Sequence, residues 1–322
     1  MVDEAWPRVS VVVAARNAEP TLAACLTSLQ ALDYPAFDVI VVDDGSRDAT
    51  ATIAEAAGAV VMLGPGRGAG SARNVAIHAT TSDIVAFTDA DCTVPPHWLR
   101  ALVGGLRQPS VAGAGGRQRN VFPAATAAGS DAADAFDAFF RAASVVSAYT
   151  RTDDRMRRVN HVASCNSAYW RDALLDVGGF ADDFWPGEDV DLDHRLRQRG
   201  YGCLYVPAAE VRHHRPGTVA WFRTMMRRYG GAERALVRRH GWFRLIHVVP
   251  VATGVAAAAQ LLWLSAPARP LVASLDLAAI VVGIGLVTVS AAPRHWGRVA
   301  GYAALAFWEW HRGWWTAKGT RA

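Results

Sequence analysis

Short apolar runs alternate with helix-like segments through the first 240 residues of the chain. The first run, Val9 to Ala14, is rich in valine and precedes a segment with helical spacing of leucines, Glu19 to Ala31. A strand that is apolar on both sides is typical of a parallel sheet with helices on both faces. The repeated strand–helix unit therefore predicts an α/β fold with a Rossmann-like, mostly parallel sheet. Its further strands are expected at Val39 to Val42, Ala59 to Leu63 and Ile84 to Thr88.

The density of apolar residues rises sharply near residue 245. Two runs, Leu245 to Leu264 and Leu271 to Ala292, are each long enough as helices to cross a hydrocarbon core of about 30 Å. We therefore predict two domains, an α/β domain at residues 1–240 and a membrane region at 241–322. A buried helical hairpin in a soluble domain is the alternative.

Arginines gather before the first apolar run. Seven of them lie between Arg223 and Arg244 against one acid, Glu233, whereas the link between the two runs carries only Arg269. Because cytoplasmic loops are rich in basic residues, the α/β domain is expected at the cytoplasmic membrane, facing the cytosol. The arginines would contact anionic membrane lipids. The aromatic-rich stretch 299–315 is expected to form an interfacial helix, with a third span as the alternative.

The composition also excludes some classes of chemistry. The chain has one lysine, Lys318, and no glycine-rich loop precedes it, which excludes a P-loop. The arginine-rich region adjoins the apolar runs, so lipid is a simpler partner than nucleic acid, and no nucleic-acid binding is expected. No CxxC spacing is present, so neither a zinc site nor a disulfide framework is expected, and reduced thiols are predicted at Cys25, Cys92, Cys165 and Cys203.

Polar residues follow the predicted strands at the points where they end. Asp43 and Asp44 follow the second strand, and Asp89 and Asp91 follow the fourth. Ligands of such sheets bind beyond the carboxyl ends of the strands, and acids that meet there need a cation or a donor-rich ligand. Two carboxylates two residues apart suit Mn²⁺ or Mg²⁺ shared with a diphosphate. Simple capping by Asp43 or Asp44 is the alternative.

Five motifs together resemble those of glycosyltransferase family 2, whose members have the GT-A nucleotide-sugar-binding fold. They stand in family order within about residues 8–240, and together they are highly specific although each alone would not be. The resemblance implies a metal-dependent inverting transferase that moves a sugar from a UDP- or GDP-linked donor to a hydroxyl of a lipid-linked or cell-envelope glycan. The motifs are VSVVVAARN from Val9, VVDDGSRD from Val41, GSARN from Gly70, FTDAD from Phe87 and GEDVDL from Gly187.

The resemblance assigns roles to single residues. Asp89 and Asp91 would hold the metal, with His213 completing the site; either His213 or His214 could instead be an ordinary residue at a strand end. Asp44 would accept a hydrogen bond from the base, and Asn166 would lie near the donor sugar. The residues implied in binding the nucleotide sugar are Ala15, Asn17, Asp43, Asp44, Arg73, Asp89, Asn166, Arg228 and Tyr229.

The resemblance also implies a catalytic base, Asp189. An acceptor hydroxyl must lose its proton as it attacks the anomeric carbon, and the metal would neutralise charge on the departing diphosphate. Glu188 would orient or tune Asp189. The alternative is that Glu188, Asp189 and Asp191 are acids that the helix dipole favours in a first turn.

One departure from the family concerns polymerisation. Processive synthases of the family carry a Gln-x-x-Arg-Trp box, and the comparable stretch, Met225 to Gly230, lacks the Gln and the Trp. Processive synthesis is therefore not expected. Two other functions stay open: a polyprenyl-phosphate glycosyltransferase, and a non-catalytic membrane scaffold that binds nucleotide sugars. The intact acids Asp44, Asp89, Asp91 and Asp189 argue against the scaffold.

Overall fold

The structure is a computed structural model in which the chain divides by contacts into two compact units. The first unit comprises the described residues up to 121 together with 154–215, and the second comprises the rest. The predicted domain boundary after residue 240 stays a prediction. The residues that the structure describes are 6–123, 154–182, 184–254 and 296–317.

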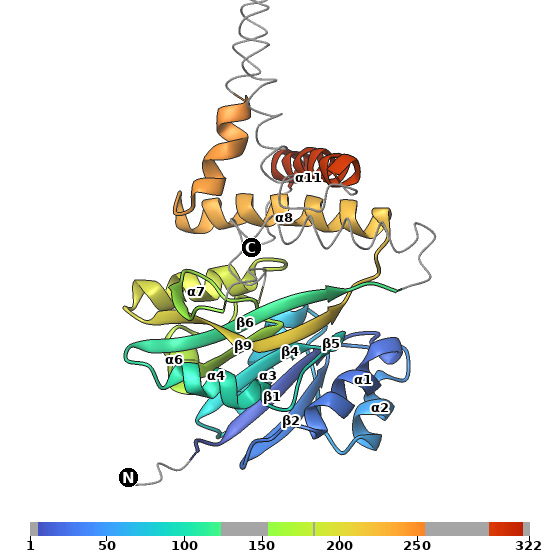
Figure 1. Cartoon of the computed structure of the whole chain (residues 1–322), viewed down its shortest axis with the longest axis vertical. Coiled ribbons are helices and arrows are strands. Elements are labelled where there is room, and N and C mark those ends of the chain that lie inside the picture. Colours follow the sequence, from blue (N-terminus) through green and yellow to red (C-terminus); the bar gives the residue numbers. More distant parts are fainter. Residues whose placement is uncertain (1–5, 124–153, 183, 255–295, 318–322) are drawn as a thin grey trace, which may run out of the picture. The chain divides into compact units, whose positions relative to one another are not determined.

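A nine-stranded mixed sheet forms the centre of the first unit (Figure 1). Its strands are β1 (Val9–Ala15), β2 (Phe37–Asp43), β3 (Val60–Leu63), β4 (Ile84–Asp89), β5 (Cys92–Thr93), β6 (Val111–Val121), β7 (Arg157–Val159), β8 (Asn166–Trp170) and β9 (Gly202–His214). They are ordered β3-β2-β1-β4-β8-β6-β9-β5, and β7 pairs with β9. Neighbours from β3 to β4 are parallel, as predicted, whereas β8 runs antiparallel to both β4 and β6.

Helices cover both faces of this sheet, and the sequence of β1 shows why. Val9, Val11 and Val13 point into one core with leucines of α1 and α4, whereas Val12 points into a second core with α3, α6 and α7. Side chains of a strand alternate between faces, so a strand covered on both sides must be apolar throughout. The predicted α/β fold is confirmed. The helices are α1 (Glu19–Gln30), α2 (Thr50–Ala56), α3 (Ala69–Ala79), α4 (Trp98–Leu106), α6 (Arg171–Asp176) and α7 (Glu188–Gln198).

One local prediction is wrong. The glycines from Gly113 to Gly116 predict a flexible turn, yet they lie inside β6. A side chain on Gly116 would collide with the backbone of Ala209 on β9, and one on Gly113 would meet the ring of Tyr169. The glycines therefore serve close packing of neighbouring strands rather than a turn.

The second unit contains two long helices, α8 (Val219–His240) and α11 (Trp296–Thr316), which pack against each other (Figure 1). Gly230 of α8 lies against the backbone of Trp310, and Gly313 of α11 lies against that of Arg227, so any side chain at either glycine would clash. These glycines let the two helix backbones approach closely.

A buried acid joins the same two helices. Glu309 of α11 is fully buried and accepts hydrogen bonds from Arg223 at 2.7 Å and from Arg227 at 2.6 and 2.8 Å. Two of the arginines that the sequence assigns to lipid headgroups therefore have a partner within the protein.

Within the described residues, the structure contains no helix with both the length and the apolar character needed to cross a bilayer. The helices searched include α11, which contains the stretch 299–315. Of the two predicted spans, 245–264 and 271–292, all but residues 245–254 lie outside the described residues.

Candidate active site

The loops after β1 and β2 meet at the carboxyl edge of the sheet, as predicted. The carbonyl of Ala15 accepts a hydrogen bond from the backbone N–H of Asp44 at 2.8 Å. Asn17 has a φ of 52°; its side-chain oxygen accepts from the N–H of Arg47, and its own N–H donates to the hydroxyl oxygen of Ser46, each at 2.9 Å. Ala15 and Asn17 therefore hold the two loops together.

The two acids after β2 have different partners. Asp43 accepts from the N–H of Ser46 at 2.9 Å and so closes the turn after the strand. Asp44 is 2% exposed, and its two oxygens accept from the N–H groups of Gly66 and Gly68, both at 2.7 Å. A carboxylate offers about four lone-pair positions, so Asp44 has acceptor capacity left for an N–H of a ligand.

Two carboxylates and one imidazole converge next to these loops. One ligand atom from each of Asp89, Asp91 and His213 lies within 4.8 Å of the others, and Asp91 Oδ1 is 3.0 Å from His213 Nε2. The adjacent His214 points to the other face of β9, where its ring is 3.3 Å from the hydroxyl of Thr93. Oxygen and imidazole ligands with room for water suit Mn²⁺ or Mg²⁺, so these three residues fit the predicted metal.

The acid and the histidine of this group form an ion pair. Burial raises the pKa of Asp91, but the charge and hydrogen bond of His213 outweigh it and lower that pKa overall. Burial and Arg215 lower the pKa of His213, but Asp91, together with the thiol of Cys165, outweighs both and raises that pKa to about 9. A cation bound here would replace the imidazole proton, so metal binding should release a proton.

A buried arginine connects this group to the start of α7. Arg73, 2% exposed, donates to Asp89 Oδ1 and to Glu188 Oε1, both at 2.8 Å. Gly70 lies on α3, as Arg73 does, and packs against the side chain of Glu188. It is two residues from Gly68, whose N–H donates to Asp44. The predicted contact of Arg73 with the nucleotide stays a prediction; in this structure Arg73 positions two acids.

Asp189 is the most exposed of the three acids at the start of α7. Its side chain is 18% exposed, whereas Glu188 is nearly buried and Asp191 is fully buried and paired with Arg195. The backbone N–H of Ser164 donates to Asp189 Oδ2 at 3.2 Å. Asp191 thus fits the alternative of a structural first-turn acid, and Asp189 is the acid that a ligand can reach.

The sequence did not reveal the residues behind Asp189. His161 lies with Nε2 3.8 Å from Asp189 Oδ2 and with Nδ1 3.2 Å from Asp193 Oδ2. Asp193 is fully buried and also accepts from the hydroxyl of Tyr169 at 2.9 Å. Asp193 lies one helical turn after Asp189, a spacing that places both on one face of α7. The four-residue spacing from Asp189 could have pointed to Asp193 from the sequence alone. Nothing in the sequence around His161 points to its place beside Asp189.

Asn166 holds the sheet together. Its amide donates to the carbonyls of Arg117 and Ala209 at 2.9 and 2.7 Å and accepts from the indole of Trp98 at 2.8 Å. Both N–H bonds of this fully buried side chain are therefore used within the protein. The predicted place beside a donor sugar stays a prediction, as do the roles of Arg228 and Tyr229, which lie on α8 in the second unit.

A cavity of about 730 Å³ lies on the other face of β5 and β9. Thr93 and Arg212, which pair in register, line it, whereas the neighbouring pair Cys92 and His213 points to the opposite face. The cavity is therefore separate from the place where the acids converge.

Residues 10–178 match a protein family described as Glycosyl transferase family 2. The chain belongs to this family. It is 33% identical over 239 residues to the pre-mycofactocin glycosyltransferase of Mycobacterium tuberculosis, a match that covers 72% of this chain and 48% of that protein. It is 28% identical over 207 residues to glycosyltransferase AglE of Haloferax volcanii, covering 62% of this chain and 64% of AglE. The chain thus spans less than two thirds of the length of these relatives.

Solved structures share the fold of this family 2 chain. The mannosyltransferase PcManGT of Pyrobaculum calidifontis, in complex with GDP-Man and Mn²⁺, superposes with a TM-score of 0.63 at 22% identity. That match covers 95% of this chain and 87% of PcManGT. GalNAc-T7 with UDP, GalNAc and Mn²⁺ gives a TM-score of 0.53 at 16% identity, covering 70% and 48%. At these identities the likeness establishes the GT-A-like fold.

The buried arginine gives a stability prediction. Arg73→Met should lower the free energy of unfolding by about 3–5 kcal/mol at pH 8, because it leaves the buried Glu188 carboxylate without its cation. Denaturant unfolding measures the change. Arg199→Met, which breaks an exposed pair with Asp176, should cost at most about 1 kcal/mol. Equal effects of the two substitutions would contradict the role given to Arg73.

Glu188 gives a pH prediction. Burial and the adjacent Asp189 raise its pKa from 4.5 to about 7, against the opposing effect of Arg73. The folded state therefore holds a proton that the unfolded state has lost, and stability must fall as pH rises from 4.5 to 7. Relative to Glu188→Gln, which does not titrate, the wild-type chain should lose up to about 3 kcal/mol over that interval. Urea unfolding of both proteins across this range measures it, and a difference that stays constant or grows with pH would contradict it.

Proposed function

We propose that this chain is a Mn²⁺- or Mg²⁺-dependent inverting glycosyltransferase that transfers a sugar from a nucleotide-diphosphate sugar to a hydroxyl. The observation that carries the proposal is the meeting of Asp89, Asp91 and His213 beside the Asp44 loop, with Arg73 linking Asp89 to Glu188, the residue before Asp189. Family membership supports it, as do PcManGT with GDP-Man and Mn²⁺ and GalNAc-T7 with UDP and Mn²⁺. UDP- and GDP-linked donors are therefore the first to be tested.

Each group of residues has a separate task in the proposed reaction. Asp44 accepts an N–H of the base with its remaining lone pairs, and Asp89, Asp91 and His213 hold the cation. A bound divalent cation supplies neutralising charge to the departing diphosphate. Asp189 takes the proton of the acceptor hydroxyl, which attacks the anomeric carbon from the side opposite the diphosphate. A single displacement of this kind inverts the anomeric configuration.

The surroundings of Asp189 suit a general base. It is partly exposed, so a hydroxyl can reach it, and the N–H of Ser164 fixes one of its oxygens. His161 lies next to Asp189, and the buried Asp193 holds the His161 ring in place. A base of this kind favours a hydroxyl acceptor on a lipid-linked or cell-envelope glycan. A polyprenyl phosphate, already an anion, would need little help from a base.

The place of action that we propose is the cytosolic face of the cytoplasmic membrane. The support comes from the two long apolar runs at 245–264 and 271–292 and from the arginines that precede them. Recovery of the full chain in the membrane fraction after alkaline washing would support this location, and its release into the wash would oppose it.

The proposed reaction is tested with the full chain, radiolabelled UDP- and GDP-sugars, and either glycan or polyprenyl-phosphate acceptors, with Mn²⁺ or with a chelator. We expect transfer to a hydroxyl acceptor that stops on chelation and returns with Mn²⁺. Transfer to polyprenyl phosphate alone would favour the alternative acceptor. Donor binding without transfer or donor hydrolysis under any condition would favour a non-catalytic scaffold.

A further inference from the structure

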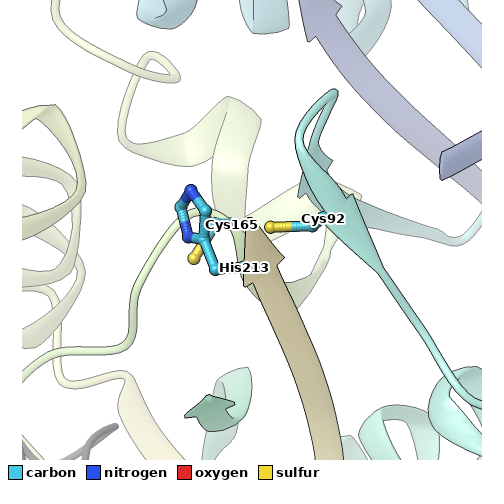
Figure 2. Close-up of side chains that lie close together, drawn as sticks. All are labelled: Cys92, Cys165 and His213. Atoms are coloured by element: carbon cyan, nitrogen blue, oxygen red, sulfur yellow. The ribbon is translucent and has the colours of Figure 1, made fainter. Parts of the chain in front are cut away.

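His213 has a second set of neighbours, two thiols, one of which lies close to the carboxylates: Cys92 Sγ is 4.0 Å from Asp91 Oδ1. One ligand atom from each of Cys92, Cys165 and His213 lies within 4.8 Å of the others, and all three side chains are buried. Figure 2 shows the two sulfurs and the imidazole directed toward one another. Cys92 lies on β5 opposite His213 of β9, and Cys165 immediately precedes β8. Three segments far apart in the sequence therefore supply this cluster.

The ring of His213 has one nitrogen without a hydrogen-bond partner. Nε2 lies 3.0 Å from Asp91 Oδ1, whereas Nδ1 is buried and makes no hydrogen bond of normal geometry, although the neighbouring Cys165 thiol helps to raise the pKa of the ring. Buried polar atoms are nearly always bonded, so an unbonded nitrogen next to two thiols needs an explanation. A metal ion that accepts the Nδ1 lone pair would provide one.

The spacing of the three atoms suits a tetrahedral ion. With Zn–S bonds of about 2.3 Å and Zn–N bonds of about 2.0 Å, ligand atoms of a tetrahedral site lie about 3.5–3.8 Å apart. Because the three ligand atoms lie within 4.8 Å of one another, small side-chain movements would bring them to these distances. Asp91 on the far nitrogen completes the carboxylate–histidine arrangement that orients ligating histidines.

We propose that Cys92, Cys165 and His213 Nδ1 bind a thiophilic divalent cation such as Zn²⁺, with water as the fourth ligand. Thiolate and imidazole ligands select Zn²⁺, whereas carboxylates and water select Mn²⁺ and Mg²⁺. The sequence predicts no zinc site because these residues lack any CxxC spacing, whereas the pairing of β5 with β9 places Cys92 opposite His213 without such spacing. The site is new and differs from the carboxylate site in its thiol ligands, but the two share His213, which would bind a cation through Nδ1 here and through Nε2 there.

A direct test uses Co²⁺ as a probe on the reduced, metal-free full chain. One equivalent of Co²⁺ should give a sulfur-to-cobalt charge-transfer band and the visible bands of a tetrahedral ion, and Zn²⁺ should abolish both. Cys92→Ser and Cys165→Ser should each remove the charge-transfer contribution of one sulfur and weaken binding at least about ten-fold. Cys25→Ser, which alters a buried cysteine outside the cluster, should leave spectrum and affinity unchanged.

A second variant separates this site from the carboxylate site. Asp89→Asn should leave the Co²⁺ spectrum intact, since Asp89 belongs only to the carboxylate cluster. The wild-type spectrum decides the proposal even where a cysteine variant does not fold. A wild-type chain without a charge-transfer band in excess Co²⁺, or a band that persists unchanged in both folded cysteine variants, would overturn the proposal. Because both sites use His213, sugar transfer is measured separately, on the zinc-free chain with Mn²⁺ alone, and its presence or absence does not decide this proposal.

Discussion

Asp189→Asn should lower the turnover of sugar transfer by about 10²–10⁴-fold, the range that a positioned general base contributes. The substitution keeps the size of the side chain, and its one oxygen can still accept from the N–H of either Ser164 or Val190, but an amide cannot take the proton of a hydroxyl. Donor affinity should change little, because the proposed base faces the acceptor. Initial rates at saturating donor, together with calorimetric titration of the donor analogue in Mn²⁺, separate the two quantities.

The matched control for this variant is Asp172→Asn, which removes an exposed acid from the first turn of α6. It should leave turnover within about two-fold of the wild-type value, since surface substitutions of this kind change little. If Asp189→Asn kept wild-type turnover, Asp189 would have no part in proton transfer. A loss of donor binding equal to the loss of rate would assign it to binding instead.

Substitution of the metal group should have the second large effect. His213→Gln and Asp91→Asn should each weaken Mn²⁺ binding by at least about 100-fold, because even outer residues of metal sites contribute 10–100-fold. Transfer at a fixed low Mn²⁺ concentration should fall in proportion. Titration of Mn²⁺ followed by electron paramagnetic resonance measures the affinity directly.

The chain offers a matched control in the adjacent histidine. His214 points to the opposite face of β9, so His214→Gln should keep the Mn²⁺ affinity of the wild-type chain. Equal losses in the two histidine variants, or no loss in either, would show that the cation binds elsewhere. Chelation provides the same comparison without substitution: the wild-type chain should lose transfer and regain it with Mn²⁺.

The parallel strands of the sheet could be predicted from the sequence, because they depend on the local pattern of apolar residues. Valine-rich runs identified β1, β2 and β4 to within two residues, because strands covered on both faces must be apolar throughout. The rule that parallel strands end at one edge then placed the loops of Asp44 and Asp89 together. Asp91 and His213 could be paired only through the family resemblance, since they lie far apart in the sequence.

Features that depend on pairing between distant segments could not be predicted. The glycines at 113–116 suggested a turn because their packing partners, Ala209 and Tyr169, lie elsewhere in the chain. The same reason hid the neighbourhood of Cys92, Cys165 and His213 and the support of Asp189 by His161. The protein partners of Asn166 and Arg73 could not be predicted either: the sequence indicates only polar side chains near a binding site, and the structure shows their hydrogen bonds to groups from distant segments.

Anomalous diffraction from crystals of the full chain with Mn²⁺ and a nucleoside diphosphate would test most directly how the acids act together. The result that supports our interpretation is one manganese peak coordinated by Asp91, with Asp89 and His213 beside it, and a diphosphate oxygen completing its coordination while Asp44 accepts from the base. A peak away from these residues, or a nucleotide bound in a cavity that Asp44 and Asp189 do not share, would contradict it.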